Sequence, residues 1–414
     1  MPCIASRQRQ RGAVIVTAAL TLLFLLGFMG IALDFGRLFV VKTELQTAMD
    51  SCALAAAGEL DGQRTALTRA TSAGLTAGNL NNVNLQSSSW NGQGKIVGAD
   101  ITFKDEDYLA TTDAALAKYA KCQHTQAGTK MWLLQALGAF TGDTATHPAA
   151  RSVAAQAVAT RASAQTACML PIGICDKAGG YKRGEWLLED SSASAGRPEG
   201  KFLWLDFSAN SGGTDDLKAL LEGPGQCDLS PVNTRVTQQL QGTRTSAIRS
   251  YNTRFGIYKG NSTAGESTPD LSGYAYYQNT IPAQPPYPNK SADFLQNRRP
   301  VNSPYEDKGP DNPDLNLKVS GGGATVLNSS ELRNVGASRR VVTVPSISCP
   351  IPANKSVQIS SVACVFLLHP VDGSGSKDLI WLEYLGQANE LDSPCSTFGL
   401  SGGVGGPLVP VLVR

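Results

Sequence analysis

The residues in this sequence best suited to chemistry are its nine cysteines. A structural zinc site would need cysteine pairs at CxxC spacing, or histidines close to such a pair. No CxxC occurs, and His124, His147 and His369 are not at ligand spacing from a cysteine pair. In an oxidising compartment, an even set of cysteines forms disulfides. We therefore expect disulfides among the eight cysteines that follow residue 33: Cys52, Cys122, Cys168, Cys175, Cys227, Cys349, Cys364 and Cys395.

The sequence does not decide how these cysteines pair, because connectivity cannot be deduced from spacing alone. Short loops would join Cys168 to Cys175 or Cys349 to Cys364, and Cys122 with Cys168 is a further option. All of these pairings stay open at this stage.

Two acidic stretches have spacings that could bind a metal. Asp206-Phe-Ser-Ala-Asn210 follows an apolar run and resembles the Asp-x-Ser-x-Ser motif of von Willebrand A modules, but Asn210 replaces the second serine. Asp372 to Glu383 has oxygens at the positions of a calcium loop, yet Lys377 stands where that loop needs glycine. We expect turns between strands at both places and no bound metal or other cofactor. A metal-dependent adhesion or ligand-binding module remains the alternative.

Enzyme signatures are missing from the sequence. It contains no HExxH, no Walker loop and no GxSxG elbow. Three histidines leave a Ser-His-Asp site open, so an envelope hydrolase is the second alternative. We expect a protein that is not an enzyme.

The element that organises the chain is the run Ala13–Leu33, which contains no charged residue. As a helix it would be about 31 Å long, the thickness of the hydrocarbon core of a bilayer. Arg7, Arg9 and Arg11 precede it without an acid, which places the N-terminus in the cytoplasm. No small-x-small cleavage site separates the run from Asp34–Arg37, so we expect an uncleaved anchor.

Residues 34–62 continue this helix as a stalk. Apolar residues recur every three or four positions, which predicts one apolar stripe. They are Leu38, Val41, Leu45, Met49, Cys52, Ala56 and Leu60. The stripe would pack either on the outer domain of the same chain or on the stalk of another copy, giving self-association.

The helix carries a resemblance to a known family. The segments Gln10–Val14 (QRGAV), Ala32–Arg37 (ALDFGR), Leu45–Ala48 (LQTA) and Cys52–Ala57 (CALAAA) follow in order. This arrangement resembles the N-terminal segment of TadE/TadG-like proteins of the Flp (Tad) pilus-assembly system. The resemblance implies a protein of the bacterial inner membrane, with an extracytoplasmic domain that works beside other pilus and secretion components.

One departure separates the sequence from pilin subunits. These have a glutamate at the fifth position after the processing glycine, whereas Thr17 stands there after Gly12. We therefore favour a TadG-like structural accessory over a fibre subunit. The motif residues are Gly12, Asp34, Gly36 and Arg37, and we expect Asp34 and Arg37 to pair at the membrane surface.

Beyond the stalk we expect an α+β fold rich in strands. Residues 63–230 form an α+β region and residues 231–414 a β-rich region with a long irregular loop at 259–316. Residues 340–344, 361–368, 379–385 and 409–413 are expected to form strands of one sheet. A net charge of +2 indicates no polyanionic partner, so we do not expect nucleic-acid binding.

Four further segments have local patterns. Residues 61–94 are polar and indicate a loop or weak helix, and Met131–Phe140 indicates a short apolar helix. Residues 153–160 are ambiguous, since their alanines favour a helix and their alternation a strand. Cys168–Cys175 contains Pro171 and is expected to be an extended loop.

Overall fold

The structure, a computed structural model, describes residues 11–143, 145, 150–189, 201–207, 213–238, 248–259, 262–276, 289–306, 324–371, 380–397 and 399–413. The chain forms two compact units, one of Met1–Arg161 with Pro410–Arg414 and one of Ala162–Val409. The expected division at residues 230/231 lies within the second unit. The α+β class is confirmed, with a long apolar N-terminal helix followed by a β-rich body that has four disulfides.

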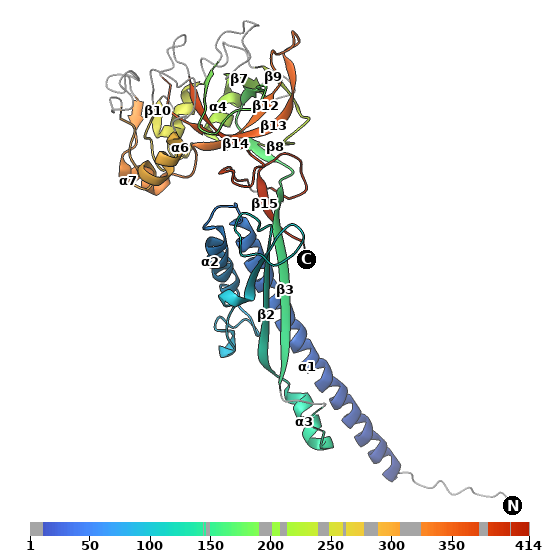
Figure 1. Cartoon of the computed structure of the whole chain (residues 1–414). Helices are drawn as coiled ribbons and strands as arrows, with labels where there is room; N and C mark the ends of the chain where they lie inside the picture. Colours follow the sequence, from blue (N-terminus) through green and yellow to red (C-terminus); the bar gives the residue numbers. More distant parts are fainter. Residues whose placement is uncertain are drawn as a thin grey trace, which may run out of the picture. The chain divides into compact units, whose positions relative to one another are not determined.

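The first unit is built along α1 (Arg11–Gly58), a single continuous helix (Figure 1). Large apolar side chains from Val14 to Leu33 are exposed. The apolar stripe of the stalk is buried, and Val41, Leu45 and Met49 have no exposed surface. One helix therefore carries both a lipid-compatible segment and a stalk that packs within its own chain.

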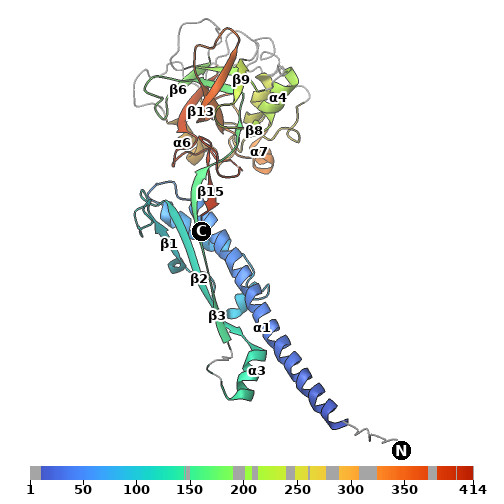
Figure 2. The same ribbon diagram turned by 90° about the vertical axis from the view of Figure 1, so that its right-hand side faces the viewer.

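A second helix, labelled in Figure 1, and a small sheet, labelled in Figure 2, cover the stalk part of α1. The helix is α2 (Ala66–Asn79), and two short 3-10 turns, η1 (Trp90–Gly92) and η2 (Gly98–Asp100), follow it. The sheet has the order β1 (Ile101–Lys104), β2 (Tyr119–Lys130), β3 (Ala150–Ser163) and β15 (Leu408–Leu412), and β1, β2 and β3 are antiparallel. Between β2 and β3 lies the helix α3 (Trp132–Thr141).

Alternating alanines explain why residues 153–160 form a strand. Ala155, Ala157 and Ala159 of β3 are buried and belong to the same apolar cluster as the stalk. Side chains of a strand alternate between its faces, so these small residues form a flat surface on which a helix can pack. Of the loop or weak helix expected at 61–94, the structure has a helix over part of the range, α2, whose buried residues are Ala66, Ala70, Gly74 and Gly78.

The second unit contains a mixed sheet with the order β6-β14-β13-β9-β7-β5-β12-β4-β8. Its strands are β4 (Ala167–Met169), β5 (Ile172–Cys175), β6 (Trp186–Glu189), β7 (Lys201–Asp206), β8 (Gln226–Leu229), β9 (Arg235–Gln238), β12 (Val341–Ile347), β13 (Ser356–Leu367) and β14 (Trp381–Gln387). Further pairings of β6 with β7 and of β12 with β13 close the ring β6-β14-β13-β12-β5-β7. Closure removes exposed strand edges.

Smaller elements surround this ring. They are α4 (Thr214–Glu222), η3 (Ile248–Phe255), β10 (Ile257–Lys259), α6 (Lys290–Asp293), η4 (Phe294–Arg298), β11 (Ala324–Val326) and α7 (Ser329–Val335). The main apolar cluster joins side chains of the ring with α4 and η3, among them Trp204, Leu217 and Phe255. The expected irregular loop at 259–316 thus contains α6 and η4 in its described part.

Two expectations for this unit were wrong. Residues 409–413 do not share a sheet with β12, β13 and β14, because β15 joins the sheet of the first unit. Residues 168–175 are not an extended loop but β4 and β5, which flank Pro171. The proline lies between the two strands, where its missing N–H costs no ladder hydrogen bond.

The disulfides join Cys52 to Cys122, Cys168 to Cys227, Cys175 to Cys349 and Cys364 to Cys395. None of the short-loop pairings considered from the sequence occurs. The strand partners explain this, since β4 pairs with β8, which contains Cys227. Cys175 pairs with Ile347 in the ladder, two residues before Cys349.

Candidate membrane-anchoring site

The apolar part of α1 has the length and composition needed to cross a membrane. Among the described residues, α1 is the one helix that is long and apolar enough to cross a membrane. Only 6% of its most apolar 18-residue stretch is buried. None of the described residues covers its side chains from Val14 to Met29. Gly30 is the first buried residue of the helix, and the site begins there.

At this level α3 packs against α1. The Oδ2 atom of Asp34 accepts hydrogen bonds from the backbone nitrogens of Leu133 at 2.9 Å and Leu134 at 2.7 Å. These N–H groups belong to the first turn of α3, whose own N-cap residue, Met131, provides no side-chain acceptor. Asp34 thus satisfies donors that a helix leaves open, and its charge complements the positive end of the helix dipole.

Two further contacts complete the joint between the helices. A Cβ atom on Gly30 would lie 3.1 Å from Cβ of Leu133, so glycine allows α3 to approach closely. The Arg37 guanidinium lies 5.5 Å from the centre of the Trp132 ring, a cation–π contact.

The motif residues expected from the sequence have different surroundings. Asp34 and Arg37 do not pair with each other; Asp34 contacts the backbone of α3, and Arg37 contacts its Trp132. Gly36 is exposed, with no atom within 4 Å of an added Cβ. Gly12 is in the first turn of α1, where side chains lie outside the described part. Gly30, Trp132 and Leu133 were not among the residues expected at this site, although the uncharged helix at 131–140 was a signal for them.

Above the joint, polar groups attach the stalk to β3. The Lys42 ammonium donates to the carbonyl of Ala154, and the Gln46 amide donates to the carbonyl of Gln156 at 2.8 Å. Further along, Cys52 is bonded to Cys122 of β2. Because these contacts lie on successive turns of α1, the stalk is held to the sheet over much of its length.

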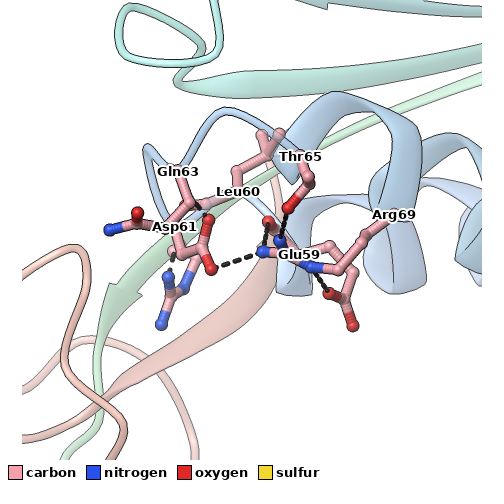
Figure 3. A network of polar contacts seen from close by, with 7 residues as sticks. Glu59, Leu60, Asp61, Gln63, Thr65 and Arg69 are labelled. Atoms are coloured by element: carbon pink, nitrogen blue, oxygen red, sulfur yellow. Dashed lines mark hydrogen bonds and ion pairs between the residues drawn. The ribbon is translucent and has the colours of Figure 1, made fainter. Parts of the chain in front are cut away.

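An ion-pair network fixes the turn between α1 and α2 (Figure 3). Arg69 donates to Glu59 Oε2 at 2.9 Å and also contacts Asp61 and Thr65. The hydrogen bond with Glu59 raises the pKa of Arg69, which keeps the guanidinium charged. Arg161, at the end of β3, donates to the carbonyl of Leu60 at 3.2 Å.

The metal and enzyme alternatives gain no support from the described residues. Asp206 ends β7, but residues 208–210 and 372–379 lie outside the described part. No group of three or more His, Cys, Asp or Glu side chains is placed to hold a metal ion within that part. His124 Nδ1 lies 2.9 Å from Asp100 Oδ2, and His369 Nδ1 lies 2.7 Å from the carbonyl of Pro370.

One buried acid in the second unit has an unusual environment. Glu383 is fully buried, and burial raises its pKa to about 7. Its carboxyl group accepts from the Ser291 hydroxyl at 2.6 Å and from the Lys290 backbone nitrogen at 2.8 Å. A depression of about 540 Å³ lies beside it, lined also by Arg183, Leu385 and Asp392. These contacts tie α6 to β14, which is a structural role.

The fold and the site together define a class of protein, in which one membrane-compatible helix continues as a stalk into a disulfide-bonded α+β body. Residues 12–59 match the family described as "Putative Flp pilus-assembly TadE/G-like", so α1 is the TadE/G-like segment of this chain. The match supports a role in Flp pilus assembly. No curated protein and no solved structure matched the chain.

Proposed function

We propose that this protein is a TadG-like accessory of Flp (Tad) pilus assembly, anchored in the bacterial inner membrane with its body in the periplasm. The match of residues 12–59 to the TadE/G-like family carries the proposal. Arg7, Arg9 and Arg11 support a cytoplasmic N-terminus, and four disulfides suit an oxidising compartment.

The proposed role is structural rather than catalytic. In a pilin fibre the N-terminal helix packs against other subunits, whereas here α2 and the sheet bury the apolar stripe of the stalk. Thr17 in place of the pilin glutamate supports the same reading. Side chains such as Phe35, Phe39 and Val40 of the stalk remain exposed, and we propose them as the surface for other Tad components or a second copy.

The test is deletion of the gene in its own bacterium, with complementation by the wild-type chain. We expect the deletion to abolish or alter surface fibres and adhesion, and unchanged fibres would refute the proposal. A complementing chain whose residues 1–33 are replaced by a cleavable secretion signal serves as the matched comparison. If anchoring is required, this soluble form will be secreted and folded but will not restore fibres.

A further inference from the structure

The helix α3 has an exposed apolar surface that none of the described residues of the first unit covers. Trp132 is 64% exposed and Leu133 is 44% exposed, although both belong to the first turn of the helix. The sequence of α3, WLLQALGAFT, contains no charged residue. Large exposed apolar surfaces of this kind mark a binding site for a protein or a membrane.

We propose that α3 lies in the outer interface of the same bilayer that α1 crosses, as a second membrane-contacting element. The inference rests on the membrane-spanning role given to α1 under the proposed function. It adds an interfacial helix, held by its own protein, at the end of the hairpin formed by β2 and β3 (Figure 1).

The position of α3 along α1 supports this placement. Its contacts with α1 are made at Gly30, Asp34 and Arg37. With a rise of 1.5 Å per residue, these positions span about 10 Å around the end of the apolar run at Leu33. In a bilayer crossed by α1, this is the level at which hydrocarbon gives way to headgroups. Both views show α3 beside α1 (Figures 1 and 2).

The chemistry of the joint fits a lipid surface better than a protein partner. Phe28, Met29 and Leu33 of α1 lie within one turn of Gly30 and are exposed, and no charged residue occurs between Arg11 and Asp34. A tryptophan beside an arginine is typical of the membrane interface, where the ring lies among headgroups and the cation reaches phosphates. Asp34 satisfies the first N–H groups of α3, which lowers the cost of moving that end out of water.

Tryptophan quenching by brominated lipids tests the proposal on the full-length protein. The chain is reconstituted into phosphatidylcholine vesicles with bromines either near the headgroup or deep in the acyl chain. Wild type is compared with Trp132→Phe, a mild change at an exposed ring. Trp381→Phe, in the second unit, is the matched control. Phe24→Trp in the Trp132→Phe background places a reporter in the middle of the span.

We expect bromines near the headgroup to quench the tryptophan fluorescence of the wild type more strongly than deep bromines do. The fluorescence quenched by shallow bromines should be lost in Trp132→Phe but kept in Trp381→Phe. Equal quenching of wild type and Trp132→Phe by the brominated lipids overturns the inference. Quenching of Trp132 by acrylamide would then show that the ring faces water, and protection from acrylamide would show that protein covers it. If wild type and Trp132→Phe are quenched equally but Phe24→Trp is quenched by deep bromines, α1 spans the bilayer and only the inference on α3 fails. If Phe24→Trp is not quenched, the anchor itself fails, and the inference on α3 with it.

Discussion

Asp34 in α1 accepts a hydrogen bond of 2.7 Å from the backbone nitrogen of Leu134, 100 residues further along the chain. A carboxylate from one helix thereby caps another helix at the end of a long hairpin. The contact ties α3, and with it the end of the hairpin formed by β2 and β3, to the membrane-proximal part of α1.

Asp34→Ala should loosen the first turn of α3. Loss of an N-cap side chain costs about 1 kcal/mol, which corresponds to about fivefold faster exchange of the amides it protects. Hydrogen exchange of the full-length protein in detergent, read at Leu133 and Leu134, measures this directly. Asp34→Asn keeps an oxygen acceptor and should have a smaller effect. Unchanged exchange in Asp34→Ala would show that the cap contributes nothing.

Gly78→Ala should destabilise the packing of α2 on α1. An added Cβ would lie 2.4 Å from Ile96 Cδ1, 3.1 Å from Cβ of Cys52 and 3.2 Å from the carbonyl oxygen of Ala48, so the Ile96 side chain must turn away and α2 must move a few tenths of an ångström from α1. Overpacking of this kind costs about 1–3 kcal/mol. The measurement is the urea concentration at which the first unit is half unfolded, monitored through the hydrogen exchange of backbone amides in α2.

Gly36→Ala is the matched control for this prediction. It also places a methyl group on a helical glycine, but with nothing within 4 Å. Alanine favours a helix over glycine by about 1 kcal/mol, so this variant should be equally or more stable. Equal losses from both substitutions would contradict the close-packing argument.

Replacing both Cys52 and Cys122 by alanine should destabilise the first unit. The bond closes a loop with a sequence separation of 70, for which loop entropy predicts a loss of about 4 kcal/mol. Amides of β2 and α2 should exchange faster, while those of β13 and β14 should not change. The double replacement of Cys364 and Cys395 should give the opposite pattern, because that bond lies in the second unit. Free thiols at these positions in the purified protein would contradict the pairing.

Glu383→Gln should stabilise the protein at pH 8 but not at pH 5. The pKa of Glu383 is raised from 4.5 to about 7, chiefly by burial, so the folded protein holds this proton to higher pH than the unfolded chain. The contribution of Glu383 to stability therefore falls as pH rises from about 4.5 to about 7. Glutamine does not ionise, and its advantage should grow over this range to about 3 kcal/mol.

Urea unfolding of both proteins at pH 5 and pH 8 measures this difference. Glu266→Gln, at an exposed position of the same unit, is the control and should change stability alike at both values. An advantage of Glu383→Gln that does not vary with pH would show that the carboxyl group is ionised to the same extent in the folded and unfolded states.

Much of the helical architecture could be predicted from the sequence because its signals are local. The apolar run at 13–33 and the stripe from Leu38 to Leu60 indicated one helix with two environments, and α1 has both. The apolar pattern of residues 131–140 indicated α3. The family resemblance also came from this first segment, where an ordered set of residues lies on one helix.

The tertiary structure alone decided which distant residues meet. Asp34 and Arg37 are one turn apart, so the sequence favoured a pair between them, but α3 offered Asp34 two unsatisfied backbone donors and Arg37 an aromatic ring. The cysteine pairs depend likewise on strand order, which places β4 beside β8 and the end of β5 beside Ile347. The spacing of apolar residues and the local composition determine whether a segment such as α1 or α3 forms a helix, because they act over a few residues. Partners depend on how the closed ring and the stalk bring together residues far apart in the chain.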